Sequence, residues 1–212
     1  MPFIDSAFLA IKNAGAKTLV IDLRNNEGGV EEYGGYLYAY LARQPFVYYR
    51  KVTVANNKEP TVKQYAFLPP GYEQALPHVQ EKNGEFLWPL QEYLSEHLPK
   101  ANAFNHKVYI LTNGFSFSVT AEFASTVRTT KRAIFIGEET GGAYEGNNSG
   151  VFASVTLPNT KLTAGIPLMG FYMNTDDRTK KDRGIQPDIT LVATVQDLLK
   201  GRDVVLEKAI EE

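Results

Sequence analysis

Residues 112–122, with the sequence TNGFSFSVTAE, are the part of the chain best suited to nucleophilic chemistry. They follow an apolar run at 107–111 and lead into a helix-like stretch that continues to Val127. A serine at such a strand-to-helix bend presents its hydroxyl at a helix N-terminus, where free backbone N–H groups and the helix dipole favour developing negative charge. Ser118 is therefore a candidate nucleophile.

The hydroxyl groups of this segment also have a structural interpretation. Ser116, Ser118 or Thr120 could cap the helix by accepting a hydrogen bond from a backbone N–H group of its first turn. Because serine caps are common and serine nucleophiles are rare, the segment taken alone favours a cap.

A second polar segment, DLRNNEGG at 22–29, follows the first apolar run of the chain. Its paired glycines allow a sharp turn, since glycine adopts positive φ at little cost and carries no side chain to block a ligand. The turn could cradle an anion or an oxyanion, although an ordinary tight turn fits equally well. No Gly-Lys-Ser/Thr follows it, and it lacks the spacing of a dinucleotide turn. Asp22 and Arg24 are expected to hold the turn rather than to take part in chemistry.

The composition indicates a folded globular protein of one large domain or two small ones. The chain has 212 residues, of which 43% are hydrophobic. A net charge of -2 argues against a protein that mainly binds nucleic acid or an anionic membrane. No stretch approaches the ~20 apolar residues of a membrane span. The absence of cysteine excludes disulfides and thiolate metal sites, and no other metal-ligand or adenine-binding cluster stands out, so no cofactor is expected.

Strand-like and helix-like segments alternate along the chain, which predicts an α/β fold with crossover connections. The run 17–23 reads as a strand buried on both faces. Further strands are expected at 46–54, 108–111, 133–137 and 189–192, helices at 8–14, 33–41 and from Val204, and a hairpin joining 154–157 to 162–166. Residues 56–105 are rich in proline and read as an irregular insertion or lid, with one helix near 90–97.

In this order, the segments resemble the catalytic domain of the C-terminal-processing (tail-specific) serine peptidases, a family that includes the tricorn core protease. The resemblance rests on 22–29, 108–122, the GEETGG run at 137–142 and DRGIQPD at 182–188. The tail after residue 193 is also similar to bacterial members that lack a lysine base. The resemblance implies the crotonase/ClpP-like fold of that family, an α/β superhelix of strand–helix units with a central sheet, and makes 1–212 a single catalytic domain.

The resemblance also implies roles for individual residues. The nucleophile of the family falls on Ser118, with Ser116 as the second choice, and the oxyanion hole falls on backbone N–H groups of Gly28 or Gly29 together with Val119. The implied activity is that of a serine endopeptidase acting on a peptide or protein substrate, without a metal or cofactor. Such peptidases bind the substrate as an added β-strand, which an exposed sheet edge could accept.

The sequence does not supply an obvious general base. Many members of the family use a lysine after the Gly-Glu-x-Thr segment, but residues 141–146 (GGAYEG) contain none. Tricorn-like members use a Ser-His-Glu arrangement whose histidine precedes the first strand, whereas His78, His97 and His106 all follow it. We therefore expect 1–212 to be a C-terminal portion of a larger peptidase, with the histidine in a missing N-terminal part.

The acid of a triad is also open. Glu145 lies near the functional loop of the family, and Asp182 precedes the turn where tricorn-like members place an acid. Both are candidates.

Two other classes of function stay open. A noncatalytic relative that binds peptides or acts as a scaffold would keep the sheet and the turn but lack a base. A crotonase-type acyl-thioester enzyme would use a similar backbone oxyanion hole, although its enolate chemistry needs no nucleophilic serine. Family members are often extracytoplasmic, which is the location that the resemblance implies. The oligomeric state is not fixed by the sequence.

Overall fold

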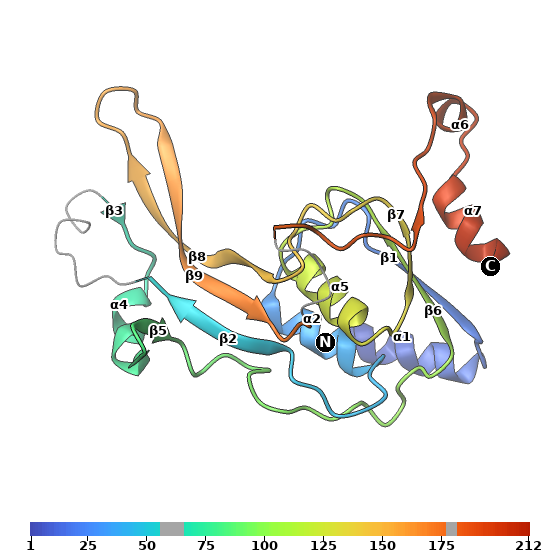
Figure 1. The fold of residues 1–212 in the computed structure, drawn as a ribbon, viewed down its shortest axis with the longest axis horizontal. Helices are drawn as coiled ribbons and strands as arrows, with labels where there is room; N and C mark the ends of the chain where they lie inside the picture. Colours follow the sequence, from blue (N-terminus) through green and yellow to red (C-terminus); the bar gives the residue numbers. More distant parts are fainter. Residues whose placement is uncertain (56–65, 177–181) are drawn as a thin grey trace.

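Two β-sheets with helices between them make up the structure, a computed structural model that describes residues 1–55, 66–176 and 182–212 (Figure 1). The first sheet is parallel, with the order β1-β6-β7-β10. Its strands are β1 (Thr18–Asp22), β6 (Lys107–Thr112), β7 (Ile134–Gly137) and β10 (Ile189–Thr190). The predicted α/β architecture is confirmed.

The parallel sheet is covered on both faces because alternate residues of β6 enter different hydrophobic clusters. Val108 and Ile110 face the main core, which also holds residues of the helices α1, α2 and α5. Tyr109 and Leu111 face a smaller cluster under the C-terminal helix. β6 is thus buried on both faces. The strand expected at 17–23 also packs on both faces, with Leu19 and Ile21 against the main core and Val20 against the smaller cluster, but β1 lies at the edge of the sheet and is only half-buried.

Five helices of the described chain accompany the parallel sheet, four of them packed in the body of the molecule and the fifth, α6, projecting away from it (Figure 1). They are α1 (Pro2–Asn13), α2 (Glu31–Ala39), α5 (Val119–Thr129), α6 (Val195–Leu199) and α7 (Val204–Glu211). Figure 1 shows α2 and α5 between the two sheets, with α7 on the far side of the parallel sheet. The rings of Phe8 in α1 and Tyr40, which ends α2, stack with centroids 4.4 Å apart. The helices expected at 8–14, 33–41 and from Val204 are confirmed, while α6 was not predicted.

The second sheet is antiparallel, with the order β3-β8-β9-β2-β5-β4. Its strands are β2 (Tyr49–Val54), β3 (Ala66–Phe67), β4 (Gln80–Lys82), β5 (Glu85–Leu87), β8 (Gly146–Thr156) and β9 (Thr163–Met173). The expected hairpin is confirmed but extends much farther than predicted, and its tip projects away from the body of the molecule (Figure 1). A short helix α4 (Tyr72–Ala75) and a 3-10 turn η1 (Leu76–His78) lie beside this sheet.

The region predicted as an irregular insertion, 56–105, contributes β3, β4, β5 and α4 in its described part. Residues 56–65 lie outside the described residues. The helix expected near 90–97 was wrong. Tyr93 has a φ of 66°, and its carbonyl oxygen accepts hydrogen bonds from the N–H groups of Tyr48 and Tyr49. The segment therefore follows the chain before β2 instead of coiling, and His97 pairs with Phe46.

We expect Ile110→Ala to lower the free energy of unfolding by about 2–5 kcal/mol, because its fully buried side chain fills the centre of the main core. Urea unfolding would measure the change. Leu157→Ala is the matched control, because Leu157 lies at the tip of the hairpin and is 44% exposed. This substitution should change the free energy of unfolding by less than about 0.5 kcal/mol. Equal effects at both positions would contradict this description of the core.

Candidate active site

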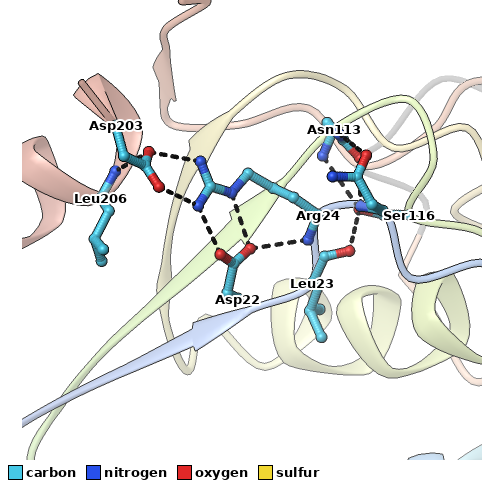
Figure 2. A network of polar contacts seen from close by, with 8 residues as sticks. Asp22, Leu23, Arg24, Asn113, Ser116, Asp203 and Leu206 are labelled. Carbon is cyan, nitrogen blue, oxygen red and sulfur yellow. Dashed lines mark hydrogen bonds and ion pairs between the residues drawn. The ribbon is translucent and has the colours of Figure 1, made fainter. Parts of the chain in front are cut away.

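Two turns meet where β1 and β6 end, because parallel neighbours carry their carboxyl ends to the same edge of a sheet. The turn after β1 and the turn after β6 are joined by their asparagines. The backbone N–H of Asn25 donates to Oδ1 of Asn113 (3.0 Å), and Nδ2 of Asn113 donates to Oδ1 of Asn25 (2.9 Å). The hydroxyl of Ser116 donates to the carbonyl oxygen of Leu23 (2.8 Å) (Figure 2). The two turns thus form one hydrogen-bonded unit.

Asn26 ties the same two turns together a second time. Its carbonyl oxygen accepts from the N–H of Phe117 (3.1 Å), and its Oδ1 accepts from the hydroxyl of Thr120 (2.8 Å) and from the N–H of Gly28 (3.1 Å). This one side chain therefore fixes the glycine turn against the start of α5. No pattern in the sequence distinguishes Asn26 from the other polar residues of its turn.

Ser118 occupies the N-cap position of α5 with a backbone conformation that is rare for a residue with a side chain. Its φ is 53° and its ψ is -131°, and its side chain makes no capping hydrogen bond. The hydroxyls of Ser116 and Thr120 are also committed elsewhere, to Leu23 and Asn26. The helix is therefore not capped by any of the three candidate hydroxyls. Such strain costs about 1–3 kcal/mol and persists only where the surroundings impose it.

Glycines make room for this conformation. Gly28 has a φ of 108°, and a Cβ atom built on it would lie 2.6 Å from Cβ of Ser118 and 3.1 Å from its Oγ. A Cβ on Gly142 would lie 2.3 Å from Cβ of Ala121 and 3.3 Å from the backbone nitrogen of Ser118. The N–H of Gly142 also donates to the carbonyl oxygen of Ser116 (3.1 Å). The loop after β7 thereby becomes a third wall of the site, and Gly142 is a residue that sequence reasoning missed.

Gly28, Gly29 and Val119 line one small cavity, and Gly28 lies against Ser118, but the backbone N–H groups of the two glycines differ. The N–H of Gly28 is occupied by Oδ1 of Asn26. In the described part of the chain, no hydrogen bond is found for the N–H of Gly29 or of Val119. Val119 is the first residue of α5, where an N–H has no partner within the helix. Both N–H groups are therefore available, among the described residues, to donate to a ligand.

A small apolar cavity of about 150 Å³ lies next to these groups. Its walls come from the turn after β1, from α2 and from the first turns of α5, and include Leu23, Val30, Tyr33, Leu37 and Phe123. A cavity with such walls can hold an apolar side chain of a ligand.

None of the three histidines reaches Ser118. The ring of His78 lies 6.4 Å from that of Trp88, and the ring of His97 lies 4.2 Å from that of Tyr93. His106 contacts Nζ of Lys17 (3.5 Å) at the start of β6, whereas Ser118 follows its end, about 20 Å away for six residues of strand. Among the described residues, Oγ of Ser118 has no hydrogen bond to a base. The candidate acids Glu145 and Asp182 are likewise not bonded to a histidine or to Ser118 within the described ranges.

Glu122 is a buried carboxyl one helical turn beyond Ser118, 1% exposed, that sequence reasoning missed. The hydroxyl of Tyr49 donates to its Oε2 (2.6 Å), and Nδ2 of Asn147 donates to its Oε1 (2.6 Å). Burial raises the pKa of this carboxyl even though both hydrogen bonds lower it. Glu122 therefore anchors α5 to the antiparallel sheet.

Arg24 has the structural role that the sequence indicated. Its guanidinium group donates to Asp22 (2.6 Å) and to both carboxylate oxygens of Asp203 (2.7 Å each), as Figure 2 shows. Asp203 also accepts from the N–H of Leu206 (3.1 Å) and so caps α7. The hydrogen bonds from Arg24 lower the pKa of Asp203 to about 2. The C-terminal helix is thus tied to the turn that carries the two glycines.

Within residues 1–55, 66–176 and 182–212, no three histidine, aspartate or glutamate side chains are grouped to hold a metal ion. In the same residues, no helix is long and apolar enough to cross a membrane.

Comparison with known proteins identifies the family. The model of peptidase family S41 matches residues 2–191. No curated protein matches the sequence significantly. The chain aligns with a Parabacteroides merdae protein provisionally described as a peptidase (20% identity, TM-score 0.61) and with mature CPAF in complex with lactacystin (17% identity, TM-score 0.61). A third structure is a Bacteroides fragilis protein provisionally described as an S41 protease (16% identity, TM-score 0.51).

These structures share the fold of the chain but are about twice as long. The alignments cover 98%, 100% and 97% of this chain, but only 56%, 48% and 47% of the respective structures. The predicted family fold is therefore confirmed.

We expect Gly28→Ala to lower the free energy of unfolding by more than about 1 kcal/mol, because the added methyl group meets Ser118 and the φ is positive. Gly29→Ala is the matched control, since nothing lies within 4 Å of a Cβ there and it should stay within about 0.5 kcal/mol. Chemical unfolding of both variants measures the difference. A Gly28→Ala protein as stable as the control would contradict the packing of this turn.

Glu122→Gln tests the buried carboxyl through the pH dependence of stability. Since the pKa of Glu122 is raised in the folded state, its contribution is fully present below the ordinary value of 4.5 and is lost as the pH rises through the raised pKa. The stability of the wild type relative to Glu122→Gln should therefore fall from pH 4 to pH 7. Glu96→Gln, at an exposed site, controls for the change of charge. A relative stability that rises with pH would mean that the fold favours the carboxylate.

Proposed function

The chain belongs to peptidase family S41, and from this premise we propose that it acts as a serine endopeptidase with Ser118 as its nucleophile. The observation that carries the proposal is the strained backbone of Ser118 at the start of α5, with Gly28 packed against its side chain. A cap would have needed neither the strain nor the glycine. Family membership supports a serine peptidase, and the assignment of individual residues goes beyond it.

In the proposed reaction, Oγ of Ser118 forms a bond to the carbonyl carbon of the scissile peptide while its proton passes to a general base. The carbonyl oxygen becomes an oxyanion, held by the N–H groups of Val119 and Gly29. Collapse of this intermediate breaks the C–N bond, the amine leaves with a proton from the same base, and water then hydrolyses the acyl-enzyme. Removal of one oxyanion donor typically costs about 10²–10³ in rate.

The general base is proposed to be a histidine from outside these 212 residues. In support of this, the three histidines of the chain lie elsewhere, and residues 141–146 contain no lysine. A serine without a base is a weak nucleophile at neutral pH, so the chain alone would be inactive. The same proposal includes an acid that completes the triad. It also includes a single catalytic domain over residues 1–212 and an extracytoplasmic location.

The second candidate is a noncatalytic peptide-binding protein. The absence of a base beside Ser118 among the described residues favours it, and the cavity at Gly28 and Val30 would serve a bound peptide equally well.

Labelling with a fluorophosphonate probe separates the two candidates. The experiment compares this chain with a chain extended at its N-terminus, each with Ser118→Ala and with Ser95→Ala, an exposed serine, as the matched control. We expect labelling of the longer chain that Ser118→Ala abolishes and Ser95→Ala preserves, and labelling of the short chain that is at least about 100-fold slower. Labelling of neither chain would contradict the peptidase mechanism and favour peptide binding.

A further inference from the structure

A second and larger pocket, of about 300 Å³, lies between α4–η1 and one face of the antiparallel sheet. Its walls are mainly apolar and aromatic, with Tyr72 from α4, Trp88 after β5, and Met169 and Phe171 from β9. Its size is that of a small ligand site. Neither the reaction at Ser118 nor the cavity beside it uses these residues.

One charged group lies in this mainly apolar setting, which also includes the polar Gln91. Glu31, the first residue of α2, is the one charged side chain among the described residues that line the pocket. It is half-buried, and a Cβ built on Gly150 would lie 3.4 Å from its Oε1. Among the described residues it has neither a hydrogen bond nor an ion pair.

The negative charge of Glu31 affects the carboxyl group of Glu122. After burial, the nearby Glu31 is the cause that raises the pKa of Glu122 further. Glu31 lines the pocket and has no cationic partner among the described residues, so it favours a positive charge at this end of the pocket. The helix dipole also stabilises an acid in the first turn of α2, but it leaves the hydrogen-bonding capacity of the carboxylate unused.

The pocket is close to the nucleophile along the chain. Gly28 contacts Ser118, and Glu31 follows it by three residues, which span at most about 11 Å even when fully extended. An extended peptide advances about 3.3 Å per residue. A substrate that crosses Ser118 can therefore place a side chain at Glu31 within about three residues of the scissile bond.

We propose that this pocket is a specificity site for a basic side chain of the peptide, with Glu31 as the residue that recognises its charge. The methylene stem of an arginine or lysine packs along the apolar walls, and its cation faces the rings of Trp88 and Phe171 while donating hydrogen bonds to the carboxylate. A neutral side chain of equal length would leave Glu31 unpaired. As a statement about substrate, this inference rests on the proposed peptidase function, but binding in the pocket needs no reaction.

Trp88 allows a direct test because it is the only tryptophan of the chain and lines the pocket. Its fluorescence is titrated in the Ser118→Ala protein with acetyl-Ala-Ala-Arg-Ala-Ala-amide and with the same peptide carrying citrulline, which has the shape of arginine without its charge. We expect saturable binding of the arginine peptide, at least about tenfold tighter than that of the citrulline peptide. Glu31→Gln should remove this preference, whereas Glu32→Gln, the exposed neighbour in the same helical turn, should retain it.

Equal affinity for the two peptides, tighter binding of a norleucine peptide, or a preference that survives Glu31→Gln would overturn the assignment. The measurement is independent of catalysis, because the nucleophile has been removed. A protein that binds the arginine peptide at Trp88 but is never labelled at Ser118 would keep this site and lose the peptidase function. A protein that is labelled at Ser118 but shows no preference for arginine would keep the peptidase function and lose this site.

Discussion

The site depends on the contact between the turn after β1 and the turn after β6. Ser118 keeps a φ of 53° only because Gly28 lies against it and because Asn25, Asn26 and Asn113 bond the turns together. The strain costs about 1–3 kcal/mol, and a net gain of about 1 kcal/mol for each of several hydrogen bonds is enough to offset it. The parallel pairing of β1 with β6 sets the distance between the turns, so the orientation of one hydroxyl follows from the register of the sheet.

The rest of the structure stabilises this contact from three sides. Glu122 anchors α5 to the antiparallel sheet through Tyr49 and Asn147, and Arg24 ties the glycine turn to the cap of α7. The loop at Gly142 closes the third side. In the proposed mechanism, the chain holds a preformed nucleophile and oxyanion site, and a base from outside the chain activates the nucleophile. Such rigidity is what electrostatic stabilisation of a transition state requires, since donors that are already in place need no reorganisation.

Much of this could be predicted from the sequence, where local pattern and chemistry agree. The apolar run of β6, the helix after Ser118 and the paired glycines each carry their own signal, and the predicted α/β architecture and family are confirmed. The wrong predictions concern features that depend on tertiary contacts rather than on the local sequence. Nothing local shows that β1 is an edge strand, or that Tyr93 adopts a positive φ. Asp203, Gly142 and Asn147 lie far from Ser118 in sequence, so only the folded chain brings them to the site.

A crystal structure of the N-terminally extended protein with a peptidyl boronic acid would show whether Ser118 is the nucleophile, because a boronate adduct has the tetrahedral geometry of the reaction intermediate. We expect a bond between boron and Oγ of Ser118, with one boronate oxygen about 2.7–3.1 Å from the backbone nitrogens of both Val119 and Gly29. An adduct at Ser116, or one at Ser118 whose oxygens face away from both N–H groups, would contradict it.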